Sequence, residues 1–305
     1  MLDFFKRKQK IIVPEHYENL INDKEYEIFI NLCLSTLKNL DYKVLSYDNG
    51  DIVYENEKRE DAHFYLDNIL RKYLLSDNNE KETEIISHFT KLKDNSTAYN
   101  YLYKDFEYAK QFLKVLIKAD DILPNNDDYV FQNHYPGLLT FLVFDFEDQF
   151  NYVEKSKALE WDISESEMFK IALNNIRLEE IEVSRLNFDD KYEIYALFSG
   201  DFSASYSLLA EQELDFTIGQ NGSLIAIPTK GSVFIFPITD EDVLDVIVTI
   251  YPTVEQIFNE EPSNISLDFY WYYQGKYEVF EKMPNDDGSV NINCPRQLVD
   301  LLNEK

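Results

Sequence analysis

The fold is set by the stretch LIAIPTKGSVFIF at residues 224–236, in which Lys230 and Gly231 separate two apolar runs. Short runs rich in Ile, Val and Phe are typical of buried strands, and Lys-Gly between them marks a tight turn. Similar runs lie on both sides along the chain, and strands joined by tight turns pair antiparallel. The segments predicted as strands are 192–199, 202–209, 214–218, 223–228, 232–237, 267–273 and 276–280.

Helical patterns accompany these strands. Ser164, with Glu167 three residues on, forms a capping box that opens an amphipathic helix. Thr239 caps a second helix, which Pro252 is expected either to stop or to kink. Residues 138–146 form a near-continuous apolar run, as expected of a central strand. Together these elements predict an α+β fold, in which an antiparallel sheet carries helices packed on one face.

The first half of the chain reads as mostly helical, with one β-hairpin. Asn49-Gly50 stands between two strand-like runs and is a strong hairpin signal, because both turn positions must tolerate positive φ. Amphipathic periodicity predicts helices in the other segments. These helical segments are 15–40, 59–75, 80–93 and 98–119.

A polar, turn-rich segment containing Pro124 is the best candidate for a domain boundary, which we place at 124–135. It predicts a helical region with a β-hairpin at 1–123 and an antiparallel-sheet α+β domain at 136–305. The alternative is a long loop inside one continuous domain. The sequence leaves both interpretations open.

The charge of the chain is strongly negative and unevenly distributed. The 29 basic and 57 acidic residues give a net charge of −28. Residues 1–130 hold 18 basic and 25 acidic side chains (−7), and residues 131–305 hold 11 and 32 (−21). Such a surface repels nucleic acid and anionic membranes, so we expect neither as a partner, and it attracts basic proteins. Solubility alone is the simpler explanation.

The cysteines and the N-terminus predict a cytoplasmic protein. Cys33 stands in an apolar helical run, far in sequence from Cys294, so a buried free thiol is expected rather than a disulfide framework. That usage fits a reducing cytosol. The charged residues at 6–8 follow a very short apolar patch, which is the reverse of a secretory signal. No apolar run approaches the ~18 residues of a membrane span.

Residues that bind metals or cofactors show no recognisable spacing, so we expect neither group. The four histidines, His16, His63, His88 and His134, lie in unrelated segments without zinc-site spacing. No glycine-rich phosphate loop is present, and no carboxylate cluster has calcium-loop spacing. Turn chemistry and helix N-terminal charge explain the carboxylate clusters. These are Asp145/Glu147/Asp148, Asp189/Asp190, Asp240/Glu241/Asp242 and Asp286/Asp287.

Two predicted strands supply the candidate interaction residues. Residues 202–208 alternate strictly, which on a strand places three serines on one face and apolar side chains on the other. A small polar sheet face is the simpler interpretation of these serines. In FYWYY, residues 269–273, about half of the side chains are expected in the core and half exposed or covered, and large exposed aromatics tend to mark contact sites. The candidate partner-binding residues are Tyr270, Tyr272, Ser203, Ser205 and Asp201.

Three stretches resemble one family. LDNILRKY, at residues 66–73, resembles a Leu-Glu/Asp-Asn-Leu-Tyr-x-x-Tyr stretch of the YtpQ-like bacterial proteins, a family of unknown function. GDFSASYSLL at residues 200–209 and the paired runs at 224–236 are similar to further segments of that family, and the order matches over residues 60–281. Where the family has Arg-Asp this chain has Lys230-Gly231, so no role of that pair carries over. The resemblance implies a cytoplasmic α+β protein. It points to no particular activity, because none is established for the family.

Three hypotheses about function follow. The first is a non-enzymatic binding or regulatory protein with an acidic, aromatic surface for a basic partner, for example an immunity-type protein that masks a cationic toxin. The second is an enzyme that uses carboxylates on a small or cationic substrate, with Asp201 or Asp145 beside Ser203 and Ser205. The third is a structural or assembly subunit. The sequence leaves the catalytic residues of any enzyme unknown and the oligomeric state open.

Overall fold

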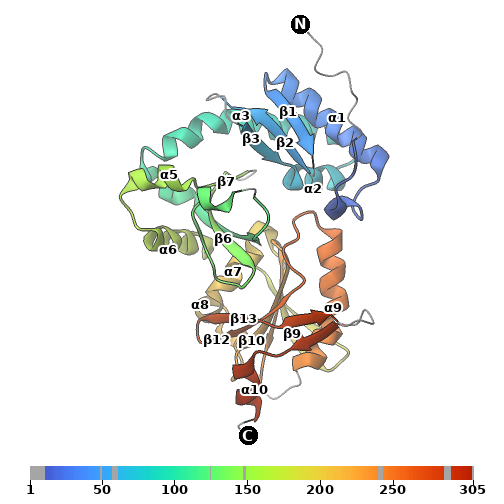
Figure 1. The fold of residues 1–305 in the computed structure, drawn as a ribbon, viewed down its shortest axis with the longest axis vertical. Coiled ribbons are helices and arrows are strands. Elements are labelled where there is room, and N and C mark those ends of the chain that lie inside the picture. Colours follow the sequence, from blue (N-terminus) through green and yellow to red (C-terminus); the bar gives the residue numbers. More distant parts are fainter. Residues whose placement is uncertain are drawn as a thin grey trace. The chain divides into compact units, whose positions relative to one another are not determined.

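The computed structural model describes residues 11–48, 50–56, 61–123, 125–146, 149–239, 243–284 and 290–303. The chain divides into two compact units (Figure 1), unit 1 with residues 1–99 and 259–263 and unit 2 with residues 100–258 and 264–305. The boundary expected at 124–135 therefore falls inside unit 2. Some sequence expectations lie outside the described residues, namely those on residues 1–8, Asn49, Pro124, Glu147/Asp148, Asp240–Asp242 and Asp286/Asp287.

Unit 1 is a three-stranded antiparallel sheet, in the order β1-β2-β3, with one face covered by helices. Ile52 in β2 and Phe64 in β3 are register partners, and both are buried with residues of three helices, among them Phe29 and Ile69. The elements are the 3-10 helix η1 (Glu15–Tyr17), α1 (Asp23–Asn39), β1 (Lys43–Asp48), β2 (Asp51–Glu55), β3 (Asp61–Tyr65), α2 (Asp67–Leu75) and α3 (Lys81–Leu102).

The predicted hairpin of unit 1 is confirmed, but the helices beside it differ from expectation. The first part of the predicted helix 59–75 is wrong, because Asp61–Tyr65 form β3, which pairs with β2 along its length. In β3, Phe64 is buried and Tyr65 is exposed, which is the period-2 pattern of a strand. The predicted helix 80–93 and the beginning of 98–119 form one continuous helix, α3.

Unit 2 begins with a small antiparallel sheet. Its strand β6, which is buried from Leu138 to Phe144, pairs with β4 on one side and with β5 and β7 on the other. Trp161 stacks on Tyr103 beside this sheet, with ring centroids 5.3 Å apart. The elements are α4 (Phe106–Ala109), η2 (Lys110–Phe112), β4 (Leu113–Ala119), η3 (Asn126–Asp128), β5 (Phe131–Gln132), β6 (Leu138–Asp145), β7 (Phe150–Tyr152), α5 (Lys155–Ala158), η4 (Leu159–Trp161) and α6 (Glu165–Ile176).

The larger sheet of unit 2 has six antiparallel strands in the order β13-β12-β10-β11-β9-β8. Its elements and those around it are β8 (Val183–Phe188), β9 (Tyr192–Leu197), η5 (Gly200–Phe202), α7 (Ser203–Tyr206), η6 (Ser207–Leu209), α8 (Ala210–Glu213), η7 (Asp215–Thr217), β10 (Ser223–Thr229), β11 (Ser232–Pro237), α9 (Val243–Glu260), β12 (Phe269–Tyr273), β13 (Lys276–Val279), β14 (Glu281–Pro284), β15 (Val290–Asn293) and α10 (Arg296–Asn303).

Both faces of the six-stranded sheet are covered. On one face, Trp271 and Phe269 of β12 are buried with α9 and α10. On the other, Tyr270 is buried with the short helices α7 and α8. The α+β class is confirmed, and the helices lie on two faces of this sheet where one face was expected. This two-sided burial explains why β10 reads as a continuous apolar run.

Several local predictions in unit 2 are confirmed. The backbone N–H of Glu167 donates to Ser164 Oγ at 3.2 Å, so Ser164 caps α6 as expected. The strands predicted at 138–146, 192–199, 223–228 and 232–237 and the final hairpin are present. Pro252 lies inside α9 and does not stop it.

Three predictions in unit 2 are wrong. Residues 113–119, expected as the end of a helix, form strand β4, because a short apolar run fits a buried strand as well as a helix. Residues 202–209 are short helices and not a strand. Residues 215–217 of the predicted strand 214–218 are the 3-10 helix η7. Strand β8, which the sequence did not predict, is the partner of β9.

Candidate functional site

Tyr270 and Tyr272, expected on a partner-binding surface, are core residues. Their exposed fractions are 0% and 5%, because both project from β12 toward the face that α7 and α8 cover. The hydroxyl of Tyr270 donates to Ser266 Oγ at 3.3 Å, and its ring packs 4.9 Å from that of Tyr135. Burial raises the pKa of both tyrosines. Of the two alternatives, exposed or covered by another element, the second holds for Tyr270 and Tyr272, so they offer no exposed contact surface.

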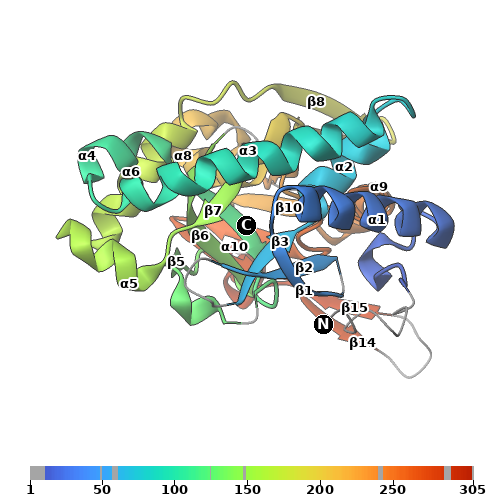
Figure 2. The same cartoon turned by 90° about the horizontal axis from the view of Figure 1, so that it is seen from above.

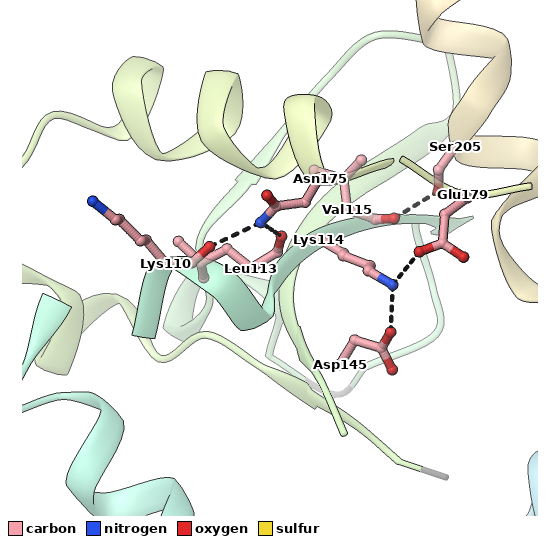
Figure 3. Close-up of polar contacts among 8 residues, drawn as sticks. All are labelled: Lys110, Leu113, Lys114, Val115, Asp145, Asn175, Glu179 and Ser205. Carbon is pink, nitrogen blue, oxygen red and sulfur yellow. Dashed lines mark hydrogen bonds and ion pairs between the residues drawn. The ribbon is translucent and has the colours of Figure 1, made fainter. Parts of the chain in front are cut away.

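Ser203 and Ser205 are also buried, with exposed fractions of 0%. Ser203 Oγ donates to the carbonyl of Ser199 at 3.0 Å and accepts from the N–H of the same residue at 2.9 Å. Ser205 Oγ donates to the carbonyl of Val115 in β4 at 2.6 Å (Figure 3). These hydroxyls satisfy main-chain groups, so the serines hold α7 in place and offer no polar surface to a partner.

Asp201 is bound to a buried lysine. Lys230 Nζ lies 3.0 Å from Asp201 Oδ1, and the Lys230 side chain is 3% exposed while that of Asp201 is 27% exposed. The ammonium group also lies 5.5 Å from the centre of the Phe150 ring, within reach of a cation–π contact. Through Asp201, Lys230 therefore holds η5, which lies directly before α7.

Asp145, the second carboxylate of the enzyme hypothesis, belongs to a similar cluster. Lys114 Nζ lies 2.6 Å from Asp145 Oδ2 and binds Glu179 as well (Figure 3). It is also 4.3 Å from the centre of the Phe202 ring. Burial by itself lowers the pKa of Lys114, but the hydrogen bonds to the two carboxylates raise it overall. Lys114 is therefore held as a cation.

The two lysine clusters meet at one pair of rings, because Phe150 and Phe202 pack edge to face with centroids 5.5 Å apart. The fold thus brings Asp145 and Asp201 into one region. Each binds a lysine that no sequence pattern indicated. A lysine that acts as base or nucleophile needs a lowered pKa, and that of Lys114 is raised. Nothing described in this region favours the carboxylate enzyme.

The lysine clusters also fix the segment that leads into β8. At the end of α6, Asn175 Nδ2 donates to the carbonyls of Lys110 and Leu113 at 2.8 and 2.7 Å (Figure 3). Four residues later, Glu179 binds Lys114. The chain therefore enters β8 from a point held by β4.

Five exposed carboxylates of unit 2 lie on or next to the β8–β9 hairpin. The segment 179–193 contains six acidic and two basic residues, a net charge of −4. Asp189 and Asp190 form the turn, both with φ of 53°, which fits the turn chemistry predicted for them. Arg185 lies 3.6 Å from Glu193, so an acidic excess is left. The exposed carboxylates here are those of Glu180, Glu182, Asp189, Asp190 and Glu193.

Unit 1 holds a separate set of titratable groups. The hydroxyl of Tyr17 donates to Asp67 Oδ1, which ties η1 to the first turn of α2, and His63 Nδ1 binds Asp51 Oδ2 across β2 and β3. Burial raises the pKa of Asp51 and lowers that of His16. These contacts join elements within unit 1, namely η1 with α2 and β2 with β3.

Comparisons with protein-family models, curated proteins and solved structures found no match to this chain. The resemblance to the YtpQ-like proteins therefore stays a prediction. Within the described ranges, no three His, Cys, Asp or Glu side chains are grouped so that they could hold a metal ion. In the same ranges, no helix has both the length and the apolar character needed to span a membrane.

Proposed function

We propose that this chain is a non-enzymatic binding or regulatory protein that docks a basic protein partner on the acidic surface of unit 2. An immunity-type protein that masks a cationic toxin is one concrete form of this function. We propose the cytoplasm as its compartment, because both cysteines are free thiols and Cys33 is fully buried.

The observation that carries the proposal is the excess of acidic over basic side chains at the β8–β9 hairpin, where five of the acidic side chains are exposed carboxylates. Glu180 and Glu182 lie at one end of β8, and Asp189 and Asp190 lie at the other. Their negative potential attracts a positively charged surface and raises its association rate. Relative to the sequence-based hypothesis, the surface is acidic but lacks the β12 aromatics, which are in the core.

The proposal is tested by affinity capture from a cell lysate with the full chain as bait. The matched bait is the variant Glu180→Gln/Glu182→Gln/Asp189→Asn/Asp190→Asn, which removes four charges at exposed positions and keeps their shapes. Capture is carried out at about 50 mM and about 500 mM NaCl, because the screening length falls severalfold over this range. We expect the wild-type chain to enrich proteins of high isoelectric point at low salt only, and the variant to lose them.

Two results contradict this function. One is capture of the same proteins by the wild-type chain and the charge-neutralised variant. The other is capture of proteins that high salt does not release, because an interaction of opposite charges on exposed surfaces weakens as salt is added. Circular dichroism of the variant serves as the control that its fold is intact.

A further inference from the structure

Strand β8 is an open edge of the six-stranded sheet. Among the described residues, β8 pairs with β9 and with no other strand. Figure 2 labels β8 in the ribbon, and the strand order places it at the end of the sheet. All six residues from Val183 to Phe188 are half-buried or exposed. The unpaired N–H and C=O groups of such an edge are a ready template for another extended chain.

Two hydrogen bonds show which main-chain groups of β8 face outward. The N–H of Glu182 donates to Ser199 Oγ at 2.6 Å, and the C=O of Phe188 accepts from the N–H of Lys191 at 3.0 Å. Both contacts are on the β9 side, because Ser199 follows β9 and Lys191 precedes it. Successive residues of a strand direct their hydrogen-bonding groups to opposite sides. The main-chain groups that point away from β9 are therefore those of Val183, Arg185 and Asn187.

We infer that an extended basic segment of the partner adds to the sheet as a strand beside β8. This inference rests on the proposed function and specifies its geometry. The three outward residues offer three N–H donors and three C=O acceptors at the spacing of a β-ladder. The carboxylates at both ends of β8 select positive charge, and Arg185 in the middle selects against it. The partner segment is thus basic at both ends and neutral or acidic at its centre.

The length of that segment follows from the same geometry. Glu182 and Asp189, which flank β8, are seven residues apart, so at about 3.4 Å per residue a strand of about nine residues reaches past both acidic ends. A flexible basic tail without strand propensity satisfies the charges but leaves the outward main-chain groups in water. Hydrogen bonds to the outward groups of β8 therefore distinguish strand addition from the binding of a flexible basic tail.

The probe is the synthetic peptide Lys-Lys-Val-Thr-Glu-Thr-Val-Lys-Lys, bound to the full chain at about 50 mM NaCl and followed by fluorescence anisotropy. The control peptide replaces both threonines with proline, which keeps every charge and removes two main-chain donors. We expect the control to bind at least about tenfold more weakly. We also expect the amide protons of Val183, Arg185 and Asn187 to exchange more slowly with the first peptide bound.

A protein variant tests the same ladder from the other side. Asn187→Pro removes an outward N–H at an edge, where proline is tolerated, and Asn187→Ala is its matched control. We expect the proline variant to bind the first peptide at least about tenfold more weakly than the alanine variant. If Asn187→Pro does not fold, the peptide pair and the amide exchange of the wild-type chain decide the question.

The outcomes separate the two proposals. Equal binding of both peptides, no binding of either, or no change in exchange at the three outward amides overturns the strand-addition inference. If lysate capture still depends on the four carboxylates in that case, the proposed function stands. If charge neutralisation changes neither capture nor peptide binding, the proposed function fails as well.

Discussion

Ser205 shows how a buried hydroxyl holds a short helix to a sheet. Its bond to the carbonyl of Val115 joins residues 90 positions apart in the chain. We expect Ser205→Ala to lower the free energy of unfolding by roughly 1–2 kcal/mol, because a buried acceptor loses a partner. Urea unfolding measures this change.

The control for this prediction is Ser156→Ala, at an exposed position of α5, which we expect to change stability by less than about 0.5 kcal/mol. Binding of basic partners is expected to stay the same in Ser205→Ala. If Ser205→Ala keeps normal stability but binds basic partners more weakly, the prediction is wrong and Ser205 takes part in partner binding.

His134 predicts a pH dependence of stability. Its ring lies 3.0 Å from Thr140 Oγ1 through Nδ1, and burial lowers its pKa. The unfolded chain therefore takes up a proton that the folded chain does not take up between the two pKa values. The contribution of the neutral His134 ring to the free energy of unfolding is complete above about pH 6.5 and is lost as the pH falls toward the pKa of the folded chain.

The measurement compares urea unfolding of the wild-type chain and His134→Gln from about pH 8 to about pH 5. We expect the wild-type free energy to fall faster than that of the variant below about pH 6.5, by at most about 1.4 kcal/mol per pH unit. Parallel curves for the two proteins would show that His134 titrates alike in the folded and unfolded chains.

At the scale of elements, the turn at Gly222 controls how β10 meets β12. Gly222 has φ of +84°, and a Cβ there would lie 2.1 Å from the carbonyl oxygen of Tyr272 and 2.9 Å from Trp271 Nε1. That backbone cannot shift easily, because Trp271 Nε1 donates to the carbonyl of Asn221 at 2.8 Å. We expect Gly222→Ala to cost more than about 3 kcal/mol, measured by thermal or urea unfolding.

Gly275 is the matched control for this prediction. It has φ of +79° in the β12–β13 turn, but a Cβ there would meet nothing within 4 Å. We expect Gly275→Ala to cost only about 1–2 kcal/mol, the penalty of the left-handed conformation. Equal losses for the two variants would mean that backbone conformation and not the contact with Tyr272 decides the cost.

Elements with local signals were predictable from the sequence. The cap at Ser164 and the final hairpin depend on residues a few positions apart, so their chemistry is visible in the chain. Strand β4 was not predictable, because a short apolar run has no period that separates strand from helix. The serine alternation at 202–208 misled for a different reason, since hydroxyls in α7 and η6 bind main-chain carbonyls and so need no solvent-facing side.

At the scale of the whole molecule, a net charge of −28 predicts sensitivity to salt. Repulsion among carboxylates destabilises the compact state, and salt screens it. Exposed ion pairs such as Lys191–Asp245, at 3.4 Å, are weakened by salt but contribute only about 0–1 kcal/mol each. We expect the melting temperature to rise by a few degrees between about 20 and 500 mM NaCl.

The control for the salt effect is sucrose at the same osmolarity, which stabilises by exclusion and not by screening. A melting temperature that falls with NaCl would show that specific ion pairs outweigh the general repulsion. Thermal unfolding followed by circular dichroism measures both cases.

The candidate site was only partly predictable from the sequence. The acidic bias of the second half is a matter of composition and was visible at once. The lysine clusters were not, because Lys114 lies 31 residues from Asp145 and 65 from Glu179, and only the fold brings them together. The open edge was missed because β8 mixes polar and apolar residues and was not recognised as a strand.

The positions of the two tryptophans give the molecule a spectroscopic asymmetry. Trp161 and Trp271 are the only two indoles of the sequence, both are buried, and both belong to unit 2. Emission therefore reports on the melting of that unit alone, whereas ellipticity sums over both. A gap between the two transition midpoints would resolve the separate denaturation of unit 1 without any label being attached.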